Sequence, residues 1–557
     1  MFRALALALL LLAPGPASAA PHARPPRTAV LDRGVVSAPE SLAAEVGARI
    51  LRDGGNAVDA AIAVHFALAV TFPNAGNLGG GGFMLVHTDS GDVAIDYRET
   101  APAAATRDMF LDASGNVVPG MSLDSRSAAG VPGSVAGMWL AHRRYGTLPW
   151  RDLLAPAIRL AADGWTLDAW TAARFAEEDR DGFRAYFHGA AGERLVQSEL
   201  AATLHRIAAR GRDGFYRGET ARLLVAEMAR GGGRIRADDL ARYQPRLRAP
   251  IAGTYRGLRV VSMPPPSSGG VGLLQLLNLL ERFEPARLGR EDAAYLHLVA
   301  ELEARVFADR AEYLGDPDLR AVRAESLVSK RYAAARAAGI ALERRTPPGE
   351  VHCGAVGHES EQTTHVSIVD RWGNAVANTT TLNDAFGSGI VVRGAGFLLN
   401  NEMDDFSARP GVPNLYGVTG GEANAIAPGK RMLSSMAPTF VYRDGRLWLV
   451  LGSPGGPTIF TTVFQVIVDR VDFGLEPADA VAAPRFHHQW PPRGADDDPI
   501  FVERGREPEA AVQAALTALG YRVQPRGPIG DVHAIEIEGR TARGVSDPRG
   551  VGRVVTE

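Results

Sequence analysis

The stretch that most constrains the fold is residues 361–383, which has the pattern of two strands joined by a tight turn. Residues 365–369 alternate polar and apolar side chains, as a half-buried strand does. Residues 370–374 supply turn chemistry, and Gly373 is free to adopt a positive φ. The sequence therefore predicts a β-hairpin here.

The centre of the loop decides which threonines face each other. If it lies at Trp372, Thr363 and Thr381 are directly opposite, with Cβ atoms about 5 Å apart. A bulge or an even-numbered loop would shift the register by one residue and turn the partner to the other face. A threonine hydroxyl needs a base, and a threonine at a new chain N-terminus has its own α-amine, with a reference pKa of about 7.7–8.0. The residues alone also allow an ordinary threonine-rich hairpin, because threonine favours strands.

Three motifs resemble the γ-glutamyltranspeptidase family of N-terminal nucleophile hydrolases. They are Gln362-Thr363-Thr364-His365, Thr381-Leu382-Asn383 and Leu399-Asn400-Asn401-Glu402-Met403-Asp404-Asp405-Phe406. The resemblance implies a precursor that cuts itself between Gln362 and Thr363, with Thr363 as nucleophile and Thr381 assisting. It also implies an α/β fold, the four-layer αββα sandwich, made of a large chain of residues 20–362 and a small chain of residues 363–557 that stay associated.

The family resemblance also assigns a site for the substrate's α-amino and α-carboxylate groups. Arg98, in Arg98-Glu99-Thr100-Ala101-Pro102, resembles the arginine that binds the carboxylate, a task suited to a bidentate guanidinium. Spacing alone favours a surface ion pair with Glu99. The remaining residues implied are Ser434 and Ser435 for the carboxylate, and Asn383, Glu402 and Asp405 for the ammonium group.

Other interpretations of these groups follow from the residues alone. Ser434-Ser435 could be a plain turn, and paired carboxylates could bind a metal. A calcium loop would need alternating oxygen ligands and a glycine that are missing here, so an ammonium partner fits better. Some family members carry glutamine where this chain has Glu402, which adds negative charge to the site.

A glycine turn and a surface loop complete the expected site. Gly452-Ser453-Pro454-Gly455-Gly456 follows an apolar strand, and consecutive N–H groups in such a turn can hold an oxyanion. The resemblance assigns that role to Gly455 and Gly456; Pro457 departs from the small polar residue common there. Residues 409–418 read as a surface loop, and the family resemblance makes them a lid with Tyr416, which favours transfer to amines beside hydrolysis.

Composition and the N-terminus bear on location and partners. The formal net charge is −3, with no block of like charge, which suggests neither nucleic acid nor an anionic membrane as partner. Residues 1–19 have a basic start, a short apolar run and Ala17-Ser18-Ala19, the pattern of a signal peptide. An exported protein, periplasmic or secreted, is therefore expected. Its single cysteine, Cys353, is given no catalytic role.

Neither a cofactor nor a metal is expected. The glycine run at residues 79–82 lacks the phosphate-loop and dinucleotide patterns, so close backbone packing beside a strand at 83–87 is the better interpretation. His487 and His488 are adjacent on a predicted strand, point to opposite faces and therefore rarely share one metal.

Periodicity predicts the remaining elements that matter below. Helices are expected at 41–51, 56–70, 150–162, 271–281, 293–314, 459–468 and 508–519, and strands at 93–97, 396–399 and 447–451. The run Pro264-Pro265-Pro266-Ser267-Ser268-Gly269-Gly270 is interpreted as punctuation before the helix at 271–281.

The function implied is attack by Thr363 on a γ-glutamyl amide such as glutathione, with release to water or an amino-acid or peptide acceptor. One alternative is an acylase of the same superfamily that acts on glutaryl or cephalosporin side chains, which Glu402 and Asp405 disfavour because a glutaryl group has no ammonium. Another is a non-catalytic binding protein on the same scaffold, which the presence of Thr363, Thr381 and both glycines disfavours.

Overall fold

The computed structural model describes residues 29–180, 182–351, 363–409, 421–490 and 497–557. The signal peptide at residues 1–19, Cys353, Gln362 and the lid residue Tyr416 lie outside the described residues, and so does the cleavage-site peptide itself. None of the described helices has the length and apolar character needed to cross a membrane.

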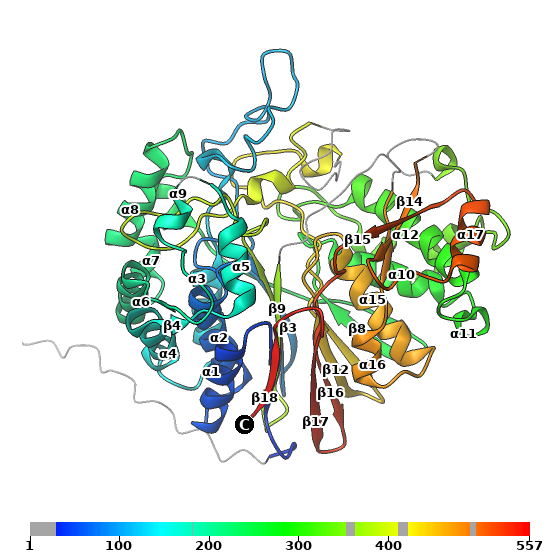
Figure 1. Cartoon of the computed structure of the whole chain (residues 1–557), viewed down its shortest axis with the longest axis horizontal. Coiled ribbons are helices and arrows are strands. Elements are labelled where there is room, and N and C mark those ends of the chain that lie inside the picture. The colour runs from blue at the N-terminus through cyan, green and yellow to red at the C-terminus, as the bar shows by residue number, and fades with distance from the viewer. Residues whose placement is uncertain (1–28, 181, 352–362, 410–420, 491–496) are drawn as a thin grey trace, which may run out of the picture.

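Two large antiparallel sheets form the centre of the molecule (Figure 1). The first runs in the order β18 (Arg553–Thr556), β1 (Val35–Ala38), β9 (Thr364–Val369), β10 (Ala375–Thr381), β2 (Gly81–Thr88), β3 (Gly91–Asp96) and β6 (Arg246–Arg248). The second runs in the order β17 (Thr541–Ser546), β16 (His533–Glu538), β12 (Arg446–Gly452), β11 (Thr439–Arg443), β8 (Leu258–Ser262) and β7 (Ile251–Tyr255). Two small sheets are β13 (Phe486–His488), β14 (Pro499–Glu503) and β15 (Arg522–Arg526), and β4 (Trp165–Thr166) with β5 (Arg194–Leu195).

Helices flank this pair of sheets on both sides, as Figure 1 shows. On one side lie α1 (Ser41–Arg52), α2 (Ala57–Thr71), α3 (Ser134–Tyr145), α4 (Trp150–Asp163), α5 (Ala169–Glu177), α6 (Ser198–Arg210), α7 (Asp213–Tyr216), α8 (Gly218–Ala229) and α9 (Ala237–Arg242). On the other lie α10 (Gly269–Leu280), α11 (Pro285–Leu288), α12 (Ala293–Tyr313), α13 (Ala324–Leu327), α14 (Lys330–Ala337), α15 (Thr458–Val471), α16 (Pro477–Ala482) and α17 (Ala510–Ala518). The α/β class is confirmed.

The first sheet is buried on both faces because each face belongs to a different hydrophobic core. Val86 and Ile368 pack with α1–α8, whereas Leu85 and Ala377 pack with the second sheet and with α10, α12 and α15. Every residue of β9 is buried. The expectation of a half-buried strand at 365–369 is therefore wrong: its polar residues face a second sheet rather than water.

The predicted hairpin and its register are confirmed. β9 pairs with β10 from Val369 opposite Ala375 to Thr364 opposite Thr380. The same register, continued by one residue, sets Thr363 opposite Thr381. The Asp370 carboxylate accepts the Trp372 N–H at 2.9 Å and the Asn374 N–H at 3.0 Å, and Gly373 has a φ of 85°.

Both large sheets contain strands from each side of the predicted cleavage point. In the first sheet β1 lies between β18 and β9, and β10 pairs with β2; in the second sheet β11 pairs with β8. The segments before and after residue 363 are thus hydrogen-bonded to each other along both central sheets.

Most predicted helices and strands are present, with ends within a few residues of those expected. One predicted strand, at residues 396–399, is absent. Residues 396–399 form no extended strand; Leu398 makes only an isolated bridge to Val391. Gly394 and Gly396 have φ values of 78° and 74°, which is turn rather than strand geometry. The apolar residues there fill the core from a loop.

Candidate active site

A small pocket, with about 250 Å³ of empty volume, lies where β9 begins. Its lining residues are Arg98, Thr363, Thr381, Asn383, Glu402, Asp405, Ser434, Ser435, Met436, Gly456 and Ile459. These come from segments spread across the chain, and only Met436 and Ile459 were not among the predicted site residues. The fold therefore brings together nearly every described residue that the sequence analysis selected.

The threonine side of the pocket is built by close backbone packing. The Thr381 hydroxyl accepts the Asn383 N–H at 2.8 Å, and Asn383 adopts a φ of 81°, which asparagine tolerates better than most residues. Behind Thr381, a Cβ at Gly80 would lie 2.1 Å from the Thr381 carbonyl oxygen. The glycine run thus allows the close approach expected of it.

The predicted oxyanion turn joins β12 to α15. Gly455 and Gly456 have φ values of 131° and 55°, so both depend on the backbone freedom of glycine. The Thr458 hydroxyl donates to the Gly455 carbonyl at 2.7 Å, and Pro457 stands at the N-cap of α15. Gly456 reaches the pocket and Gly455 precedes it in the same turn.

Three charged side chains meet at the pocket floor. Arg98, which follows β3 and is fully buried, donates one guanidinium nitrogen to Glu402 and the other to Asp405. It also donates to the carbonyls of Met432 and Leu433 at 3.3 Å each. The alternative of an exposed Arg98–Glu99 pair is wrong, because both side chains are fully buried.

Burial shapes the ionisation of this cluster. Loss of hydration raises the pKa of Glu402 and of Asp405, and attraction to Arg98 offsets part of that rise. Burial also raises the pKa of Glu99 to about 7, again against the attraction of Arg98, which lies 3.6 Å away. The site is therefore an acid-rich cavity whose negative charge depends on the arginine.

Polar side chains hold the acidic segment in place. Glu402 and Asp405 lie in the short 3₁₀ helix η4 (Glu402–Asp405). The side-chain Oδ1 of Asn400 accepts the Glu402 N–H at 3.0 Å, and the side-chain amide of Asn383 donates to the backbone carbonyl of Asn401 at 3.0 Å. Asn383, two residues after Thr381, is thereby linked to the segment that carries the carboxylates.

The two serines lie on a loop that leads into β11. The Ser434 hydroxyl accepts the Met436 N–H at 3.2 Å, and the Ser434 N–H donates to Pro266 at 3.0 Å. Ser434 and Ser435 are both 3% exposed, so they contribute to a buried wall rather than to a surface turn.

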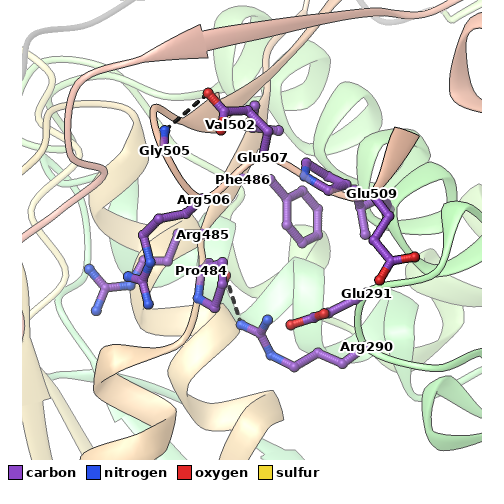
Figure 2. Close-up of a pocket in the computed structure, with 12 residues that line it drawn as sticks. Arg290, Glu291, Pro484, Arg485, Phe486, Val502, Gly505, Arg506, Glu507 and Glu509 are labelled. Carbon is purple, nitrogen blue, oxygen red and sulfur yellow. Dashed lines mark hydrogen bonds between the residues drawn. The ribbon is translucent and has the colours of Figure 1, made fainter. Parts of the chain in front are cut away.

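A larger pocket, with about 780 Å³ of empty volume, lies elsewhere and contains none of the predicted site residues (Figure 2). Its arginines are already paired: Arg290 binds Asp469 at 2.7 Å and the Pro484 carbonyl at 2.9 Å, and Arg485 binds Asp547 at 2.6 Å. Size therefore does not identify the reactive site here. Over the described ranges, no group of three or more His, Cys, Asp or Glu side chains is arranged to hold a metal.

Comparison with known proteins agrees with this geometry. The solved structure of a cephalosporin acylase from Bacillus halodurans superposes with a TM-score of 0.80 at 28% identity, covering 97% of this chain and 98% of that one. Glutathione hydrolase proenzymes from Pseudomonas aeruginosa and Escherichia coli are 49% and 48% identical, covering 94% and 93% of this chain and 94% and 91% of theirs.

The fold and the threonine-lined pocket are those of an N-terminal nucleophile hydrolase. The family follows from the sequence: the γ-glutamyltranspeptidase model matches residues 43–556. The chain belongs to the γ-glutamyltranspeptidase family, and it is an enzyme of the hydrolase and acyltransferase kind.

Sequence reasoning did not select several residues that shape the site. Met436 and Ile459 were not selected because apolar side chains carry no chemical signature. Ser268 and Arg310, which lie behind the serine loop, are distant from it in sequence. The Pro264–Gly270 run was a usable signal for Ser268, but it was interpreted only as a helix start.

Proposed function

We propose that this chain cuts itself between Gln362 and Thr363 and then hydrolyses glutathione and related γ-glutamyl amides, or transfers their γ-glutamyl group to amino acids and peptides. The observation that carries the proposal is a pocket combining a threonine with a buried guanidinium and two buried carboxylates. A γ-glutamyl group presents both an α-carboxylate and an α-ammonium, and therefore needs partners of both signs.

Substrate binding in this proposal is an exchange of ion pairs. In this structure Arg98 forms ion pairs with both Glu402 and Asp405. The α-carboxylate of a donor takes the guanidinium, with Ser434 and Ser435, while its ammonium takes the two carboxylates and Asn383. Charge-assisted hydrogen bonds of this kind are the strong ones, and no charge is left buried alone.

The reaction follows from the position of Thr363 at one end of the pocket. The α-amine freed by cleavage takes the proton of the Thr363 hydroxyl as its Oγ attacks the γ-carbonyl carbon, with Thr381 orienting the hydroxyl. The N–H groups of Gly455 and Gly456 hold the oxyanion. The C–N bond of the donor then breaks, the leaving amine takes the proton, and a γ-glutamyl ester of Thr363 remains. Water or an acceptor amine attacks that ester and restores the hydroxyl.

The same proposal covers assembly and location. Residues 20–362 and 363–557 stay together as a heterodimer in the four-layer αββα sandwich, which is supported by the strand pairs between the two segments in both sheets. The basic start, apolar run and Ala17-Ser18-Ala19 support removal of residues 1–19 and export to the periplasm or the medium. Tyr416 is proposed as part of a lid over the acyl-enzyme.

Acylase activity on glutaryl or cephalosporin side chains is the second candidate, favoured by the structural similarity to a cephalosporin acylase. Two buried carboxylates beside Arg98 oppose it, because a glutaryl donor would occupy the arginine and leave them without a counter-charge. Equal turnover of γ-glutamyl and glutaryl p-nitroanilides would favour this candidate.

The first experiment is intact-mass analysis and N-terminal sequencing of the purified protein and of Thr363→Ala. We expect two chains from the natural protein, the smaller beginning Thr-Thr-His, and one uncut chain from the variant, because the attacking hydroxyl is absent. A Thr364→Ala variant is the matched control and should still be cut. A natural chain that stays whole after prolonged incubation would contradict the proposal and favour a binding protein.

A further inference from the structure

The loop that carries Ser434 and Ser435 rests on a buried support that the proposed reaction does not use. The Ser268 N–H and hydroxyl both donate to the Ser434 carbonyl, at 2.6 and 2.7 Å. The Ser267 hydroxyl donates to the Met436 carbonyl at 2.6 Å. The run before α10 therefore acts as a template for residues 434–436.

Glycine lets this template approach closely. A Cβ at Gly269 would lie 2.3 Å from the Ser435 carbonyl oxygen and 2.6 Å from that of Met436. Ser267 and Ser434 also form an isolated parallel bridge. The template and the serine loop thus have little freedom to separate without disrupting the start of α10.

A buried arginine secures the template from behind. Arg310, on α12 and 4% exposed, donates its Nε to the Ser268 hydroxyl at 2.8 Å and a terminal nitrogen to the Ser435 hydroxyl at 3.5 Å. A guanidinium can only donate. The single hydroxyl hydrogen of Ser268 is therefore committed to Ser434, and a lone pair of the Ser435 hydroxyl faces Arg310.

This arrangement orients a hydrogen-bond donor. With a lone pair of its hydroxyl facing Arg310, Ser435 directs its hydroxyl hydrogen away from the arginine. A carboxylate in the pocket is a stronger acceptor than the neutral Ser268 hydroxyl, 3.4 Å away.

We propose that Ser268 and Arg310 are positioning residues that set the affinity of the pocket for the α-carboxylate of γ-glutamyl donors. The inference rests on the proposed function and deepens it. Neither residue lines the pocket, so both act through Ser434 and Ser435. Loss of either should weaken donor binding more than it slows the reaction of bound donor.

The test compares two p-nitroanilide donors in the self-cleaved enzyme: the γ-glutamyl compound and the 4-aminobutyryl compound, which lacks the α-carboxylate. For Arg310→Met we expect the KM for the γ-glutamyl donor to rise about tenfold, the loss typical of one charged hydrogen bond, with a smaller change in kcat. The kcat/KM for the 4-aminobutyryl donor should stay within about twofold. Arg310→Lys should restore part of the lost affinity.

Two further variants keep the test decisive. Arg305→Met removes another buried arginine of α12, one that binds Glu301 at 2.7 Å rather than the serine loop, and should leave the KM unchanged. Ser268→Ala is the milder change if Arg310→Met does not fold, and should also raise the KM for the γ-glutamyl donor.

An unchanged KM in a folded, self-cleaved Arg310→Met or Ser268→Ala variant would overturn the inference. So would an equal loss with both donors, since that would indicate general damage. A natural enzyme that is cleaved but inactive on the γ-glutamyl donor would instead refute the proposed function.

Discussion

At the scale of single residues, the acids buried in and beside the pocket cost stability when they are charged. Glu99 shows this clearly, because it is fully buried and its pKa is raised to about 7. The unfolded chain titrates near an ordinary glutamate value of about 4.3, so between these two values the folded protein binds more protons than the unfolded one. Stability from this group is therefore highest at low pH and falls as pH rises through that window.

Glu99→Gln tests this directly, because glutamine has the shape of the protonated acid without its charge. At pH 8 the variant should be more stable than the natural protein, by on the order of 2 kcal/mol, and at pH 4.5 the two should be similar. Urea unfolding at both pH values measures the difference. The exposed Glu325→Gln is the control, and an equal effect of Glu99→Gln at both pH values would contradict the prediction.

At the scale of elements, the end of β10 at Thr381 depends on the glycine run at residues 79–82. A Cβ at Gly80 would lie 2.1 Å from the carbonyl of Thr381, a backbone atom that cannot move aside cheaply. We expect Gly80→Ala to destabilise the protein by about 2 kcal/mol or more and to slow self-cleavage, because the clash displaces Thr381. Thermal unfolding and gel analysis of cleavage measure both effects.

Gly527→Ala is the matched control for that variant. A Cβ at Gly527 would have no atom within 4 Å, so this change should leave both stability and cleavage unaltered. Normal cleavage in Gly80→Ala would show that the spacing behind Thr381 is not critical.

Sequence reasoning performed best for elements with a clear period and for residues within a motif. The hairpin, its register and the helices α1, α2 and α12 were all predicted, because alternation and helical spacing are local signals. The supposed strand at 396–399 was wrong because a buried loop is as apolar as a strand. Arg310 was not selected because its contact with Ser268 links residues 42 apart, and periodicity contains no information about such pairs.

At the scale of the whole molecule, the strand pairs between the two segments in both sheets predict how the cut enzyme behaves. The two chains should co-purify and run as one species under native conditions, because separating them would break the pairs β1–β18, β1–β9, β2–β10 and β8–β11 and so open both sheets. Native mass spectrometry before and after mild urea treatment measures this. Recovery of a free small chain without denaturant would contradict it.

The proposed cut before Thr363 would also change how the protein recovers from unfolding. Before cleavage, the strands of the two segments that pair in each sheet are joined covalently and find one another at a high effective concentration. Afterwards, reassembly of the unfolded enzyme is a bimolecular event and depends on dilution. An enzyme released into dilute surroundings cannot rely on refolding, so its lifetime there is set by the rate of unfolding rather than by equilibrium. After cleavage, the protein therefore depends on a high barrier to unfolding, because unfolding is no longer readily reversed.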